Sequence, residues 1–111
     1  MDLVCRLTTL SGAPVLQVSG EIDLSTLPLL HDRLVRAITE HRGVTVFVDL
    51  DGVTALDDAG LGALLGAAGR TREQGGDVAL VCTNERLLAR FALTGLDHAL
   101  HVHARLTAPT T

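Results

Sequence analysis

The chain has 111 residues, of which 47% are hydrophobic and 20% are charged, a balance typical of one folded domain and not of a disordered chain. Its formal net charge is −4, its nine basic residues are all arginines, and its only aromatic side chains are two phenylalanines. This composition argues against nucleic-acid binding, because it offers neither a basic patch nor a stacking platform for bases. The absence of lysine excludes Schiff-base chemistry and the lysine of a phosphate-binding P-loop.

The sequence gives no sign of a membrane segment or of a redox site. Its apolar runs fall far short of the roughly 18 residues that a membrane-spanning helix needs, and residues 1–10 lack a basic region followed by a long apolar stretch. We therefore expect a cytoplasmic protein without membrane insertion. Cys5 and Cys82 lie in separate apolar segments, which predicts buried free thiols. The oligomeric state is left open.

The first third of the chain predicts a hairpin followed by a helix. Two segments rich in β-branched residues, 3–9 and 14–19, flank a turn at residues 10–13. From residue 24 to about 41, apolar residues recur at the spacing of a helix with one buried face. These apolar residues are Leu27, Leu30, Leu34 and Ile38. The helix has N-cap candidates in Asp23, Ser25 and Thr26, and Pro28 is tolerated because it falls in the first turn.

The remaining chain alternates between strands and helices. Residues 44–50 form an almost continuous apolar run, as in a central strand, and Asp51-Gly52 is expected to end it. A helix is expected over residues 59–74, a buried strand over 78–82, a third helix after the N-cap Asn84, and a short strand over 99–103. The apolar stripe of the 59–74 helix consists of Leu61, Leu64, Leu65 and Ala68.

The order of these elements, β-β-α-β-α-β-α-β, indicates an α/β domain. Alternation from the second strand onward predicts parallel pairing, so the sheet is mixed but mostly parallel, with an N-terminal antiparallel hairpin and helices packed on the sheet. We expect the domain to span residues 1–103. Residues 104–111 show no periodicity and are expected to form a disordered tail.

The segment VFVDLDGVT, residues 46–54, resembles the nucleophile loop of the haloacid dehalogenase phosphatases. That chemistry needs a magnesium site and, in that family, a downstream lysine or arginine and a further acidic pair. Here there is no lysine, and the strand at 78–82 ends in Thr83 without an acidic pair. A response-regulator receiver also requires a lysine that is missing. The resemblance to a different family, carried by three longer blocks of the sequence, implies instead that Asp49 and Asp51 are structural: they end a strand, accept hydrogen bonds from neighbouring amides and shape the turn.

Three blocks of the sequence resemble the signature of the STAS-domain family of anti-sigma factor antagonists. They are VSGEIDLSTLP at 18–28, VFVDLDGVTALDDAGLGALLG at 46–66 and LTGLDHAL at 93–100. The resemblance extends from Leu3 to His103. It implies a single STAS-type domain without catalysis or cofactor, which binds an anti-sigma factor, a GHKL-type serine kinase, and thereby releases a sigma factor.

Two aspartates, Asp57 and Asp58, precede the second helix. The unpaired amides and positive dipole at a helix N-terminus stabilise a carboxylate there by roughly 0.3–1 kcal/mol. One aspartate is enough to cap the helix, so the second is available to face a partner. Family members usually read D-S-[SG]-G-[LI]-G here, with the serine as phospho-acceptor, whereas this chain reads D-D-A-G-L-G. The acceptor position is therefore Asp58, and Ala59 also lacks a hydroxyl.

The resemblance implies a partner surface formed by two segments. These are the loop residues Asp23, Ser25 and Thr26 and the helix-start residues Asp57, Asp58, Ala59, Gly60, Leu61 and Gly62. For Asp23 and Ser25, N-capping of the first helix is an interpretation of equal weight, and it does not exclude the partner role. Asp58 is either a phosphomimetic aspartate that holds the protein off, or a residue that the partner accepts while control lies elsewhere; we favour the second.

Two further patterns have structural interpretations. Gly62, Gly66 and Gly69 share one helix face, which favours close packing of that helix on the sheet over partner docking. His98, His101 and His103 lack the spacing of a metal site and are expected to form an exposed histidine-rich edge without a metal. An alternative function is that of an accessory STAS subunit of a membrane lipid-transport ATPase complex, and a small haloacid-dehalogenase-like phosphatase is a further, less favoured alternative.

Overall fold

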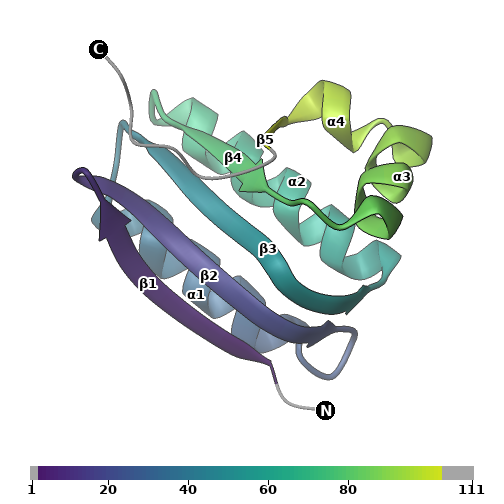
Figure 1. The fold of residues 1–111 in the computed structure, drawn as a ribbon. Coiled ribbons are helices and arrows are strands. Elements are labelled where there is room, and N and C mark those ends of the chain that lie inside the picture. The colour runs from purple at the N-terminus through teal and green to yellow at the C-terminus, as the bar shows by residue number, and fades with distance from the viewer. Residues whose placement is uncertain (1–2, 104–111) are drawn as a thin grey trace.

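The computed structural model describes residues 3–103, which form a five-stranded sheet with two helices behind it and two more beyond its β4 side (Figure 1). The strands are β1 (Val4–Leu10), β2 (Ala13–Ile22), β3 (Thr45–Leu56), β4 (Asp77–Val81) and β5 (His101–His103), and they lie in the order β1-β2-β3-β4-β5. Only β1 and β2 pair antiparallel, and the other neighbours pair parallel. The predicted fold class is confirmed. The predicted tail, residues 104–111, lies outside the described residues.

The hairpin between β1 and β2 turns where the sequence predicts it. Ser11 and Gly12 both have positive φ angles, 51° and 84°. Two consecutive left-handed residues form the tight turn whose twist suits a two-residue hairpin. Leu10 therefore pairs directly with Ala13.

The helices are α1 (Leu27–Glu40), α2 (Asp58–Glu73), α3 (Glu85–Thr94) and α4 (Leu96–Ala99). In Figure 1, α1 and α2 cover one face of the sheet, and α3 and α4 lie beyond β4. Gly95 ends α3 with a left-handed φ of 77°, as its position after the helix predicts. The short helix α4 was not predicted; its last residue, Ala99, was expected to begin the last strand, which starts at His101 instead. Among residues 3–103 no helix has the length and apolarity needed to cross a membrane.

The core lies between the sheet and these helices. Alternate residues of the central strands point toward the helices, and the apolar stripes of α1 and α2 pack against them. The strand residues are Leu16, Val18, Val48, Leu50, Val78 and Leu80, and the helix residues are Leu30, Leu34, Ile38, Leu61, Leu64, Ala67 and Ala68. Leu65 was assigned to the α2 stripe incorrectly. Its side chain is exposed, because α2 turns Ala67 and Ala68 toward the core instead.

The prediction that Asp51-Gly52 ends the third strand is wrong. β3 continues to Leu56 because β2 also continues, and the two strands stay paired through to Ile22 and Leu56 with two register shifts. Gly52 is required inside the strand, since a Cβ atom there would lie 2.4 Å from the Ser19 hydroxyl oxygen. As a result, α2 begins directly after β3, and only Asp57 lies between the two elements.

Candidate functional site

The loop between β2 and α1 is held by one carboxylate. Asp23 accepts hydrogen bonds from the Ser25 amide at 2.9 Å, the Ser25 hydroxyl at 2.6 Å and the Thr26 amide at 3.1 Å. The Ser25 hydroxyl, followed by the Thr26 amide, lowers the pKa of Asp23 below its ordinary value, because these donors favour the charged carboxylate. Asp23 therefore fixes the shape of the loop as an anion.

Thr26 occupies the N-cap position of α1 but makes no side-chain bond to the helix. Its hydroxyl instead donates to the Glu21 carbonyl at 2.8 Å and accepts from the Asp23 amide at 3.0 Å. Thr26 is nearly buried, so it secures the loop from within. Leu24, at the outer side of the same loop, is 76% exposed.

The start of α2 uses its two aspartates differently. Asp57 is the N-cap, and its carboxylate accepts from the Gly60 amide at 3.0 Å. Its own amide donates to the Ile22 carbonyl at 3.1 Å, which joins the α2 start to the end of β2. Asp58 takes no part in this cap, and its side chain is 93% exposed. The capping expected from the sequence is thus carried by one carboxylate, and the other faces outward.

Asp58 forms an ion pair that the sequence analysis missed. The Arg90 guanidinium on α3 donates through Nη2 to Asp58 Oδ1 at 2.7 Å, across 32 residues of chain. The Arg90 side chain is 34% exposed. Nothing in the spacing of the motif signals this pair, because it depends on where α3 lies relative to α2.

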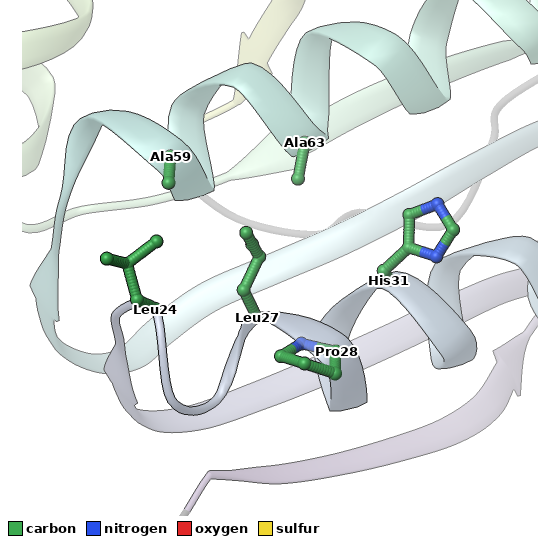
Figure 2. Close-up of a pocket in the computed structure, with 6 residues that line it drawn as sticks. All are labelled: Leu24, Leu27, Pro28, His31, Ala59 and Ala63. Atoms are coloured by element: carbon green, nitrogen blue, oxygen red, sulfur yellow. The ribbon is translucent and has the colours of Figure 1, made fainter.

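An apolar hollow of about 430 Å³ separates the two segments of the candidate surface. It is lined by Leu24, Leu27, Pro28, His31, Ala59 and Ala63. Figure 2 shows Leu27 on α1 pointing toward α2, and Ala59 and Ala63 on α2 pointing back toward α1. Asp58 directly precedes Ala59 in the chain but does not line the hollow, and its exposed carboxylate is directed to Arg90 on α3.

Two residues of the predicted surface support it from below. Gly60 is buried, and a Cβ atom there would lie 2.5 Å from Ile22 and 2.6 Å from Leu56. Leu61 is 5% exposed and belongs to the core. Gly62 is exposed with open space around its Cα. The outer part of the surface therefore consists of Leu24, Ser25, Asp58, Ala59 and Gly62, and we call it the two-loop surface.

Comparison with known proteins identifies the family. The STAS domain matches residues 5–108 of the chain. The chain belongs to the STAS-domain family of anti-sigma factor antagonists. Members of this family are non-catalytic regulators, so this STAS protein is not an enzyme.

Relatives match over most of their length. The anti-sigma-B factor antagonist of Bacillus subtilis is 32% identical over 88 residues, which cover 79% of each chain. The anti-sigma-B factor antagonist of Staphylococcus aureus is 26% identical over 103 residues, covering 93% of this chain and 94% of that one. The crystal structure of an anti-sigma factor antagonist from Mycobacterium paratuberculosis superposes with a TM-score of 0.85 at 25% identity, covering 95% of this chain and 88% of that one.

The Asp49 and Asp51 carboxylates of this STAS domain have structural roles, as predicted. Asp49 accepts from the Asp51 amide at 3.0 Å. Asp51 accepts from both the amide and the hydroxyl of Thr83, at 2.6 and 3.0 Å. Asp51 thus joins β3 to the connection between β4 and α3, a contact the sequence did not reveal.

The prediction that Gly62, Gly66 and Gly69 pack closely on the sheet is wrong. Cβ atoms added to Gly62, Gly66 or Gly69 would meet nothing within 4 Å, and all three residues are exposed. Within the described part of this STAS domain the face therefore does not pack closely on the sheet.

The predicted histidine edge is exposed, since His98, His101 and His103 all lie at the surface. Within residues 3–103 no group of three or more histidine, cysteine or acidic side chains is placed to hold a metal ion.

The two cysteines differ in burial. Cys82 is buried as predicted, whereas Cys5 is only half-buried because it lies on the edge strand. Burial is the main cause that raises the pKa of both thiols.

Proposed function

We propose that this protein binds an anti-sigma factor of the GHKL-type serine kinase class through the two-loop surface and so releases a sigma factor in the cytoplasm. The observation that carries the proposal is an exposed Asp58 at the start of the helix whose Ala59 and Ala63 line an apolar hollow, on a domain of the anti-sigma factor antagonist family. Residues 24–31 and 59–63, distant in sequence, line the apolar hollow, and the ion pair of Asp58 and Arg90 joins the start of the same helix α2 to α3. That composition suits recognition of another protein.

The proposal includes Asp58 as the replacement for the family's phospho-acceptor serine. Serine phosphorylation cannot occur at this position, because neither Asp58 nor Ala59 has a hydroxyl. An aspartate supplies about one negative charge, whereas phosphoserine supplies about 1.5 to 2 and three acceptor oxygens. We infer that the partner accepts Asp58 and that control comes from expression, another ligand or another modification.

The ion pair with Arg90 supports this inference, because it offsets the charge that a phosphomimetic residue would have to present. Asp57 supports it as well. It satisfies the cap by itself, so Asp58 is not needed for folding α2 and is available for recognition.

Titration calorimetry tests the proposal directly. The purified protein is titrated against each GHKL-type anti-sigma factor of its host, with Mg-ADP or Mg-ATP, as wild type and as Asp58→Ser. We expect the wild type to bind one of them at micromolar affinity or better. Glu73→Ser is the matched control: it removes the same charge from the same helix, about 22 Å away at its C-terminal end, and should bind like the wild type.

The other outcomes are distinct. Binding by Asp58→Ser alone would show that the aspartate is a built-in off signal, which contradicts acceptance of Asp58 by the partner. Absence of binding by both proteins to every anti-sigma factor would contradict the proposed function and favour the accessory subunit of a transport complex.

A further inference from the structure

We propose that Arg90 is a specificity-determining residue of the two-loop surface, because it presents Asp58 to the partner as a neutral ion pair and not as a free negative charge. This inference rests on the proposed function and adds to it the residue that makes an aspartate acceptable at position 58. Arg90 lies outside the motif that marks the surface, 32 residues after Asp58.

The pair joins two helices at one exposed point. Arg90 Nη2 and Asp58 Oδ1 are 2.7 Å apart, a distance typical of a charge-assisted hydrogen bond. Asp58 is the first residue of α2, where the helix dipole also favours a negative charge.

The helix that carries Arg90, α3, is fixed at its N-terminal end. The Asn84 side chain caps α3 by accepting from the amides of Arg86 and Leu87, and Asp51 anchors the preceding Thr83. Phe91, the next residue of α3, is fully buried in the core. Arg90 therefore extends toward Asp58 from a fixed helix. Forming the ion pair costs only the conformational entropy of ordering the Arg90 side chain.

A phosphoserine and this ion pair differ greatly in charge. The pair sums to about zero, whereas phosphoserine brings about −1.5 to −2. A partner site that rejects the phosphorylated form of a relative by charge repulsion would not reject the pair. Removal of Arg90 would leave Asp58 as an uncompensated anion at the same place.

The pair itself is tested in the protein alone. Urea unfolding of the wild type, Arg90→Gln, Asp58→Asn and the double variant gives a double-mutant cycle that isolates the coupling between the two side chains. We expect a coupling equivalent to about a 1.4- to 5-fold change in the unfolding equilibrium constant at 20 mM NaCl, as for exposed ion pairs. It should fall toward none at 1 M NaCl, where screening is strong. If the changes in unfolding free energy of the two single variants add up to that of the double variant at low salt, the two side chains are not coupled and the ion pair is refuted.

The role in recognition is tested with the anti-sigma factor that binds the wild type most tightly in the calorimetric series. Arg90→Gln should weaken binding at least tenfold. Arg86→Gln, the same change one turn earlier on the exposed surface of α3, should stay within twofold of the wild type. The double variant Arg90→Gln with Asp58→Asn should recover most of the affinity, because no bare charge remains.

Three results would overturn the role. Wild-type affinity in Arg90→Gln would show that the partner does not read the pair. A double variant as weak as Arg90→Gln would show that Arg90 contacts the partner directly and does not act through Asp58. If the wild type binds no anti-sigma factor, the proposed function and the role of Arg90 both fail. Additive unfolding energies in the double-mutant cycle would overturn the role of Arg90 and leave the proposed function standing.

Discussion

Replacing Gly60 by alanine should destabilise the protein, because the space beside this residue is already filled. A Cβ atom at position 60 would lie 2.5 Å from Ile22 Cγ2 and 2.6 Å from Leu56 Cδ1. Favourable carbon–carbon contacts lie at about 3.5–4.0 Å, so both contacts would be strongly repulsive. Ile22 and Leu56 are buried at the ends of β2 and β3 and have little room to turn away. The first turn of α2 would have to move outward.

The size of the effect follows from two opposing contributions. Overpacking a filled core typically costs about 1–3 kcal/mol. Alanine is a better helix former than glycine by up to about 1 kcal/mol, which offsets part of that cost. We therefore expect Gly60→Ala to lower the free energy of unfolding by about 1–2 kcal/mol, which corresponds to a drop in Tm of roughly 4–8 °C for a domain of this size.

Gly62→Ala is the matched control on the same helix. A Cβ atom there meets nothing within 4 Å, so only the gain in helix propensity remains. We expect a rise of up to about 1 kcal/mol. Urea and thermal unfolding followed by circular dichroism measure both variants. Equal stability of the two variants, or a Gly60→Ala protein more stable than the wild type, would refute the packing argument.

Three further predictions concern the carboxylates and the apolar hollow. Asp51→Ala removes two hydrogen bonds to Thr83 and should cost about 1–3 kcal/mol in urea unfolding, whereas Asp51→Asn, which keeps an acceptor oxygen, should cost less. Asp23→Ala should be less stable than the wild type at pH 7. The pKa of Asp23 is lowered in the folded state, so its contribution is present above the unfolded value of about 3.9 and lost as pH falls through the folded pKa; the two unfolding curves should therefore converge below about pH 4. Leu24→Ser should leave Tm within about 2 °C, since surface changes usually stay within about 0.5 kcal/mol, and should weaken calorimetric binding of the anti-sigma factor about tenfold.

The sheet and its helices were predictable because their signals are local. Buried parallel strands appear as nearly continuous apolar runs, and α1 shows the spacing of a helix with one buried face. The end of β3 was mispredicted, because Asp51 and Gly52 are typical turn residues when only the sequence is considered. Their place inside a strand depends on the neighbouring β2, where Ser19 and the Val18 carbonyl lie so close to position 52 that a side chain there would force them to shift.

In the candidate site, likewise, the local contacts were predictable and the long-range contacts were not. Caps act within three or four residues of the chain, so the aspartates before α2 could be assigned from spacing. Arg90 could not be found in this way, since its contact with Asp58 depends on the packing of α3. The exposed glycines of α2 were misinterpreted for a related reason. Glycine spacing shows which face of a helix lacks side chains, but it does not show whether another element packs against that face. A Cβ atom added at Gly62 would meet nothing within 4 Å.

The hydrogen-bond donors to four aspartates explain why Asp58 is the carboxylate available for recognition. Asp49, Asp51 and Asp57 each accept a hydrogen bond from a backbone amide, a donor whose position is fixed by the fold. Asp58 is bound by a side chain that can rotate away without disturbing any strand or helix. A partner can therefore contact Asp58 together with Arg90 without disturbing the fold, whereas reaching the other three carboxylates would require displacing backbone amides and hence local unfolding.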